Sequence, residues 1–379
     1  NKIFIYMRNL ILCLLGLMMS CSDVKNDNNQ LEGRLKDPNM ILKDDVRLNP
    51  DLAKALKEFG MDGVAPGAPV AIDSNEEDKL KYISDSEPQY QGLFSLIFSE
   101  FKSADDIIND TIIIDGVDNN KIKLYISKPK KMDGNIPGVL HIHGGGMALM
   151  TAGDPNYLFW RNSLAAQGLV VVGVEFRNIG GILGNHPFPA GLNDCYSALN
   201  WFHNNKEELG VSKIIISGES GGGNLSIATA LKAHQEGVSD YIDGVYAQCP
   251  YISNMYNKKD KKLLSLIEND TYFLNVEAMN VTASLYDGVN SKNPLAWPYH
   301  AELSLLEGLP PHIITVNELD PLRDEGIIFY EKLKEASVNS ELKIIKGTVH
   351  AAENIFPNQI PEISDSVIKD IKDFSYSLK

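Results

Sequence analysis

Short β-rich runs alternate with amphipathic stretches from about residue 111 to the end of the chain. Such alternation is typical of a mainly parallel sheet that is covered by helices on both faces. We expect eight strands, over residues 111–114, 121–127, 138–141, 169–176, 213–217, 244–248, 312–316 and 342–345. We expect helices over residues 157–167, 190–204, 224–235, 323–336 and 363–377.

Two segments do not follow this alternation. Residues 46–108 are largely helical or irregular in pattern, and residues 251–300 separate two predicted strands by more than an ordinary connection. Both segments are candidates for a helical cap over the ends of the strands. The alternative is that either one packs on the flank of the sheet. The catalytic domain would then consist of residues 109–250 and 301–379.

The first 21 residues have the pattern of a sorting signal, a basic start followed by an apolar run. The run Leu10 to Met19 is about half of the roughly 20 residues that a membrane-spanning helix needs. The sequence LMMSC resembles a bacterial lipoprotein box, which predicts Cys21 as a lipid attachment site. The alternatives are cleavage without lipid, or a loosely held hydrophobic leader.

A lipid on Cys21 implies an exported protein that is held at a membrane of the bacterial cell envelope. The segment that follows is polar and has no periodic apolar face, so residues 22–45 are predicted to be a flexible tether.

The formal net charge is −15, and no lysine-rich patch interrupts it. The negative charge of the protein would repel a phosphate backbone, so nucleic acid is not an expected partner. Outside the signal the cysteines are Cys195 and Cys249, which we expect as two buried thiols, although a disulfide is the alternative in an exported protein. No clustered Cys/His spacing indicates a metal site.

A strand, a glycine-bounded serine and a helix follow one another in KIIISGESGGGN, residues 213–224. This is the layout of a nucleophile elbow, in which Ser220 is held in a strained turn while small neighbours let strand and helix pass closely. The motif alone is modest evidence, because a glycine-rich structural turn has the same composition. Ser220 is nevertheless the candidate nucleophile.

The run HGGG at residues 143–146 also follows an apolar strand. Backbone N–H groups can stabilise a tetrahedral oxyanion only where no side chain blocks close approach. Gly144, Gly145 and Gly146, together with Gly221 after the serine, are therefore the predicted oxyanion hole, and a flexible glycine hairpin is the alternative. His143 is expected to orient the glycine loop rather than to act as a base.

Serine needs a base, and the base needs an acid that orients it. Asp320 and His350 each follow a predicted strand by a few residues, so both should lie at the same sheet edge as Ser220. The chain order serine, aspartate, histidine is that of α/β-hydrolases. A solvated loop histidine is the alternative for His350. Asp324 competes with Asp320, but it starts a helical pattern and is better explained as an N-terminal cap.

From Pro137 to its end the chain resembles the hormone-sensitive-lipase-like family of carboxylesterases, within the α/β-hydrolase fold. The motifs that carry the resemblance are HIHGGGM, EFRN with HPFPAGLND downstream, SGESGGGN, NPLAWPY, ELDPLRDEG and GTVH. The resemblance implies a triad of Ser220, Asp320 and His350, an oxyanion hole at the glycines named above, and no cofactor. It also implies hydrolysis of carboxylic esters, commonly with short acyl chains.

The chain departs from the family pattern at three places. Met147 follows HGGG where an aromatic residue is usual, and Gly221 follows the serine where alanine is usual. The loop after Arg177 is NIGGILGN instead of a short Leu-Ala-Pro-Glu link. We expect Arg177 to pair with Asp194 and so hold this loop.

The sequence therefore predicts a serine carboxylesterase that acts on a small-molecule ester through an acyl-serine intermediate. The alternatives are a deacetylase of acetylated sugars on the same fold, or a non-catalytic homologue that binds a ligand in the hydrolase pocket. The pattern leaves the oligomeric state open.

Overall fold

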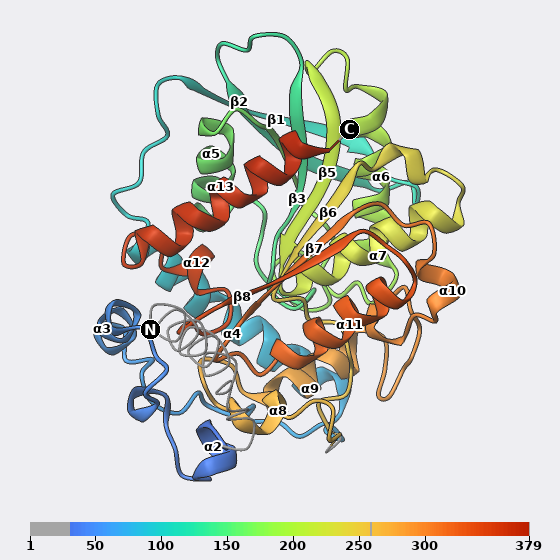
Figure 1. Cartoon of the computed structure of the whole chain (residues 1–379). Helices are drawn as coiled ribbons and strands as arrows, with labels where there is room; N and C mark the ends of the chain where they lie inside the picture. The colour runs from blue at the N-terminus through green and yellow to red at the C-terminus, as the bar shows by residue number, and fades with distance from the viewer. Residues whose placement is uncertain (1–30, 258–259, 379) are drawn as a thin grey trace, which may run out of the picture.

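Eight strands form one sheet in the order β1-β2-β4-β3-β5-β6-β7-β8 (Figure 1). The computed structural model describes residues 31–257 and 260–378. β2 runs antiparallel to both of its neighbours, and all other neighbouring strands are parallel. The strands are β1 (Ile107–Asp115), β2 (Lys121–Pro129), β3 (Ile136–Ile142), β4 (Val170–Val174), β5 (Val211–Glu219), β6 (Gly244–Gln248), β7 (His312–Asn317) and β8 (Ser340–Ile345).

The predicted architecture, a mainly parallel eight-stranded sheet flanked by helices, is confirmed. The largest difference is at the edge of the sheet, where β1 begins at Ile107 rather than at residue 111. Asn109 and Asp110 break the apolar pattern there. An edge strand tolerates them because one side of it faces solvent.

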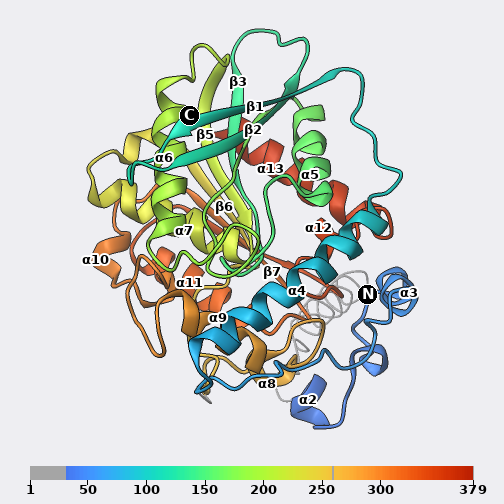
Figure 2. The same cartoon turned by 180° about the vertical axis from the view of Figure 1, so that it is seen from behind.

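Helices cover both faces of the sheet, as Figures 1 and 2 show. α5 (Pro155–Ala166) and α13 (Pro361–Ser377) lie on one face, and α6 (Ala190–Asn204), α7 (Gly221–Gln235) and α11 (Arg323–Glu335) lie on the other. The shorter elements are α2 (Gly33–Lys36), η1 (Leu42–Asp44), α3 (Pro50–Glu58), η2 (Ser239–Tyr241), α8 (Ser265–Glu268), η3 (Pro298–His300), α10 (Leu303–Leu306) and α12 (Ala352–Ile355).

The two-residue period of the strands divides the core between these faces. In β5, Ile215 packs with Trp160 under α5 and α13, whereas Ile214 and Ile216 join the cluster under the opposite helices. All three isoleucines are at most 1% exposed. Burying each such side chain contributes about 2 kcal/mol, so the central strands are the most strongly held part of the sheet.

The two segments that break the alternation contact one another. α4 (Glu76–Ile97) comes from the first and packs on α9 (Val276–Tyr286) from the second, with Lys79 Nζ 3.2 Å from Ser284 Oγ. Figures 1 and 2 show α4, α8 and α9 together at one end of the sheet. This is the end to which the carboxyl ends of β5 to β7 point.

The prediction of a flexible tether up to residue 45 is wrong for residues 31–45. α2 packs on α8, Arg34 donates to Thr271 Oγ1 over 3.4 Å, and Leu42 is fully buried. The sequence gives no periodic signal there because these short elements are held by distant parts of the chain. The predicted signal over residues 1–21 and its Cys21 lie outside the described residues.

Cys195 and Cys249 are buried free thiols, as expected. Among the residues that the structure describes, no helix combines the length and the apolar character that crossing a bilayer requires.

The expected pair of Arg177 and Asp194 is present. Arg177 Nε lies 2.9 Å from Asp194 Oδ2, and its Nη2 lies 2.9 Å from Oδ1. The same carboxylate also accepts the backbone N–H of Arg177 and the side-chain amide of Asn120. Asp194 is 1% exposed, and Arg177 is the cation recorded against its carboxylate.

We expect Arg177→Ala to lower the melting temperature by several degrees. The change leaves Asp194 buried without its cation, which costs about 2 kcal/mol when a charged hydrogen bond is lost. Lys54→Ala is the matched control, because Lys54 and Asp51 form an ion pair with both side chains mostly exposed, and such pairs contribute little. Thermal denaturation of both variants measures the difference, and equal melting temperatures would contradict the structural role of Arg177.

Candidate active site

Ser220 lies in a sharp turn between β5 and α7, with φ 58° and ψ −117°. This left-handed conformation is strained for a residue with a side chain. A Cβ on Gly218 would come 2.3 Å from the carbonyl oxygen of Ile142, and one on Gly222 would come 2.0 Å from it. Only glycine fits at either position, so the sequence folds here into the predicted elbow.

Neighbouring strand ends hold the elbow in place. The N–H of Ser220 donates to Gln248 O at 2.9 Å, and its carbonyl accepts the N–H of Tyr251 at 3.1 Å. Both partners come from the end of β6 and the residues after it. The serine side chain is partly exposed, so the turn presents a hydroxyl that a substrate can reach.

The HGGG loop lies against this turn. A Cβ on Gly221 would lie 2.8 Å from Gly146 N and 2.7 Å from Met147 N. Alanine at 221 would therefore require the loop to move. The N–H groups of Gly145, Gly146 and Gly221 donate to no group in the part of the chain that the structure describes.

The N–H group of Gly144 is not free to bind an oxyanion, contrary to the prediction. Its N–H points at Glu219 Oε1, 2.7 Å away, and at the Tyr157 hydroxyl, 3.2 Å away. The N–H of Gly144 is already used, so the candidate oxyanion donors are those of Gly145, Gly146 and Gly221. Glu219 is 3% exposed and directly precedes the nucleophile. Sequence reasoning missed its role, although its place inside the GESGG motif was a signal.

His143 occupies the position expected of a residue that orients the glycine loop. Its ring is fully buried, stacks on Phe176 with centroids 4.2 Å apart, and has Nδ1 3.0 Å from Gly144 O. Burial lowers the pKa of His143 to about 3, so the ring is neutral and donates from Nδ1. A permanently neutral ring in this place is poorly suited to act as a general base.

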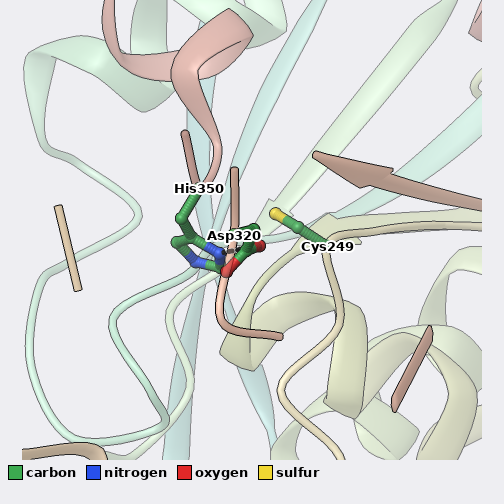
Figure 3. A group of neighbouring side chains, drawn as sticks. All are labelled: Cys249, Asp320 and His350. Atoms are coloured by element: carbon green, nitrogen blue, oxygen red, sulfur yellow. Dashed lines mark hydrogen bonds and ion pairs between the residues drawn. The ribbon is translucent and has the colours of Figure 1, made fainter. Parts of the chain in front are cut away.

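Asp320 and His350 meet at the same edge of the sheet. Asp320 follows β7 and His350 follows β8, and Asp320 Oδ2 lies 2.7 Å from His350 Nδ1 (Figure 3). Both are buried, His350 being 5% exposed. Asp320 Oδ1 accepts the N–H of Leu322 at 2.9 Å, which fixes the carboxylate. Asp324, the competing acid, accepts an N–H from the start of α8 and does not contact the imidazole.

Cys249 connects this pair to the serine turn. Its thiol lies against the backbone of Ser220, and the Sγ atom is within 4.8 Å of the nearest side-chain oxygen of Asp320 and nitrogen of His350. Figure 3 shows the thiol directed toward the pair. Burial raises the pKa of Cys249 well above its ordinary value, so the thiol stays protonated. The nucleophile candidate, the imidazole and the carboxylate therefore border one small region.

Cys249, Asp320 and His350 could in principle hold a metal ion, but the distance between Asp320 and His350 argues against a preformed metal centre. Two ligands of a tetrahedral ion, each about 2.0 Å from the metal, lie about 3.3 Å apart. The oxygen and nitrogen here are 2.7 Å apart, which is the separation of a charged hydrogen bond. The group has the geometry of an acid and a base rather than of metal ligands.

A second buried carboxylate supports the turn from behind. Glu325 Oε1 accepts the N–H of Ile252 at 2.6 Å and the hydroxyl of Tyr256 at 3.1 Å, and Oε2 accepts the hydroxyl of Ser253. It thus holds the segment whose N–H, at Tyr251, binds the carbonyl of Ser220. Burial raises the pKa of Glu325 to about 8.

The loop after β7, which carries Asp320, is held by residues of the segment 251–300. Asn269 Nδ2 donates to the carbonyl oxygens of Glu318 and Asp320, both at 3.1 Å. Arg323 forms an ion pair with Glu268 at 2.9 Å, and Arg47 contacts the same carboxylate. The acid therefore depends on contacts with residues far away in the sequence.

A protein-family profile described as alpha/beta hydrolase fold matches residues 139–354, more than half of the chain. The chain belongs to the α/β-hydrolase fold family. Brefeldin A esterase, described as a bacterial homologue of human hormone sensitive lipase, superposes with a TM-score of 0.86 at 40% identity, covering 91% of this chain and 97% of that one. The esterase Est22 gives a TM-score of 0.79 at 34% identity, with 89% and 99% covered.

Among proteins of known activity, carboxylesterase NlhH of Mycobacterium tuberculosis is 32% identical over 254 residues, 64% of this α/β-hydrolase and 74% of NlhH. The similarity to brefeldin A esterase supports the hormone-sensitive-lipase-like branch of the family. These findings confirm the prediction of a carboxylic ester hydrolase at that general level.

The stability of this α/β-hydrolase should depend on the protonation of Glu325. The unfolded chain releases this proton near the ordinary pKa of 4.5, whereas the folded protein keeps it until about pH 8. The contribution of Glu325 to the free energy of unfolding is therefore full below about pH 4.5 and falls as the pH rises toward 8.

Glu325→Gln, which cannot ionise, removes this dependence. We expect the melting temperature of the unmodified protein to fall relative to that of the variant between pH 5 and pH 8. Glu335→Gln, an exposed position at the end of the same helix, is the control and should follow the unmodified protein. Identical pH profiles for all three proteins would contradict this role of Glu325.

Proposed function

We propose that this protein hydrolyses short-chain carboxylic esters through an acyl-serine intermediate on Ser220. The observation that supports this most strongly is the hydrogen-bonded pair of Asp320 and His350 beside a strained serine turn with three free backbone donors. A receptor that has lost catalysis has no need to keep all of these groups. Their retention favours the enzyme over a non-catalytic ligand-binding homologue.

In the first step His350 accepts the Ser220 proton while the oxygen bonds to the ester carbon. The pair of electrons moves to the carbonyl oxygen, and the N–H groups of Gly145, Gly146 and Gly221 stabilise the resulting oxyanion. Asp320 keeps the imidazole oriented and stabilises its positive form. The alcohol then leaves with the proton from His350, and the acyl-serine remains.

Water completes the cycle by the same groups. His350 takes a proton from the water molecule, whose oxygen bonds to the acyl carbon, and a second oxyanion forms in the same place. When the bond between the carbon and the serine oxygen breaks, His350 returns the proton to Ser220 and the acid is released. No step needs a cofactor.

Residues 46–108 and 251–300 are proposed to act together as the cap that selects the substrate. Thr282 of α9 and Tyr251 stand over the oxyanion loop, since a Cβ on Gly146 would lie 3.4 Å and 3.8 Å from their side chains. These side chains border the space beside the proposed oxyanion donors, which favours small substituents there. It supports short acyl chains, and esters of acetylated sugars are the alternative substrate that has the same small acyl group.

Ser220→Ala should reduce kcat/KM for p-nitrophenyl butyrate by about four orders of magnitude or more, because it removes the nucleophile but keeps the Cβ and the turn. Ser86→Ala, which removes a hydroxyl of α4 that donates to Tyr82 O, is the control and should stay active. Near-normal release of p-nitrophenol by Ser220→Ala would exclude the assignment. Esters of graded acyl length, assayed in parallel with acetylated xylan, separate the two substrate classes.

We also propose that the protein is exported and anchored in the bacterial cell envelope by a lipid on Cys21. The support is the signal-like pattern of residues 1–21, which ends in LMMSC. In a bacterial host the full chain should partition into the detergent phase of Triton X-114, and Cys21→Ser should move it to the aqueous phase. Cys249→Ser is the control, and equal partitioning of Cys21→Ser and the unmodified chain would contradict the anchor.

A further inference from the structure

The loop that carries the oxyanion donors has a strained course. Gly145, Gly146, Met147 and Met150 all have positive φ, at 87°, 63°, 58° and 76°. Methionine rarely adopts this conformation, because its Cβ crowds the following carbonyl oxygen. Residues 145–150 therefore need external contacts to stay in place.

The end of the loop is coupled tightly to the donors. The carbonyl of Gly145 accepts the N–H groups of Ala148 and Leu149 at 2.9 Å and 3.2 Å. A Cβ on Gly145 would lie 2.2 Å from Leu149 O, so these two residues are in close backbone contact. A displacement at Leu149 or Met150 must move Gly145.

One buried side chain from a distant helix holds this end. Glu87 of α4 is 3% exposed, and its Oε1 accepts the N–H of Met150 at 2.6 Å. Its Oε2 accepts the N–H of Ile182, in the glycine-rich loop. Both recorded partners of this carboxylate in the described chain are backbone N–H groups, so burying it is balanced by bonds that fix two loops at once.

The two loops are also bonded to each other. Ile179 N donates to Met147 O at 3.0 Å, and Gly180 N donates to Ala148 O at 3.1 Å. Asn178 Nδ2 donates to Met150 O at 2.7 Å. The oxyanion loop therefore lies between Glu87 on one side and a short ladder of hydrogen bonds on the other.

The unusual loop sequence NIGGILGN has an explanation in this contact. A Cβ on Gly180 would lie 3.0 Å from Ile83 Cγ2, and one on Gly181 would lie 2.9 Å from both carboxylate oxygens of Glu87. Glycines at these positions let α4 approach until its carboxylate reaches the loop. The departure from the family pattern and the position of Glu87 thus belong together.

We infer that Glu87 is a positioning residue of the esterase, which fixes the oxyanion donors from the helix α4. The inference rests on the proposed function. It means that α4 does more than cover the site, because without its carboxylate the donors at Gly145 and Gly146 lose the contact that sets their direction.

Glu87→Gln tests this. The amide keeps the size of the side chain, but it presents N–H where one of the backbone N–H groups needs an acceptor. Because misplaced oxyanion donors act on the transition state, kcat for p-nitrophenyl butyrate should fall at least about tenfold with little change in KM. Binding of an aryl trifluoromethyl ketone, which forms a tetrahedral oxyanion on the serine, should weaken in parallel.

Ile83→Ala is the matched control, because it loosens the packing of α4 on the same loop and leaves both hydrogen bonds of Glu87. It should lower the melting temperature through lost packing but keep kcat within about threefold. If Ile83→Ala reduces kcat as much as Glu87→Gln, or if Glu87→Gln leaves kcat and ketone binding unchanged, the inference is wrong.

Glu87→Asp keeps the test available should the glutamine variant fail to fold. Its carboxylate is one methylene shorter and reaches only one of the two N–H groups, so an intermediate loss of kcat is expected and an unchanged kcat would overturn the inference. Ser220→Ala separates this result from the proposed function. An inactive Ser220→Ala with a fully active Glu87→Gln removes only the role of Glu87.

Discussion

The site depends on the close passage of three backbone segments at the end of β3 and β5. The carbonyl of Ile142 leaves no room for a Cβ at Gly218 or Gly222, and the amides of the HGGG loop leave none at Gly221. This packing forces Ser220 into its strained turn and brings free N–H groups to the same place. The central strands are buried on both faces, so the sheet can hold such strain.

Buried carboxylates around this turn hold the neighbouring loops in place. Glu219 engages Gly144, Glu87 engages Met150, and Glu325 engages the segment after β6. Each accepts backbone N–H groups from a segment remote in the sequence. They act as fixed acceptors that keep loops in unfavourable conformations, while the N–H groups of Gly145, Gly146 and Gly221, the proposed oxyanion donors, have no acceptor in the described chain.

The sequence predicted the parts of the site that are encoded locally. Ser220 directly follows β5, and Asp320 and His350 follow β7 and β8 by a few residues, so the parallel strands bring all three to one edge. Apart from the motif position of Glu219, nothing in the sequence indicated the supporting carboxylates, because glutamate is normally exposed and the burial of Glu87 and Glu325 depends on tertiary contacts. The bounds of α4 could not be predicted either, because its pattern is weakly amphipathic and Pro88 lies inside it. The edge strand β1 was predicted too short because Asn109 and Asp110 interrupt its apolar pattern.

The geometry of the reacted enzyme tests the account most directly. A crystal structure after treatment with diethyl p-nitrophenyl phosphate should show phosphorus on the Ser220 oxygen, with a phosphoryl oxygen about 3 Å from the N–H groups of Gly145, Gly146 and Gly221. The Nε2 atom of His350 should lie within hydrogen-bond distance of the serine oxygen. Phosphorylation of another residue, or a phosphoryl oxygen directed away from these donors, would contradict the account.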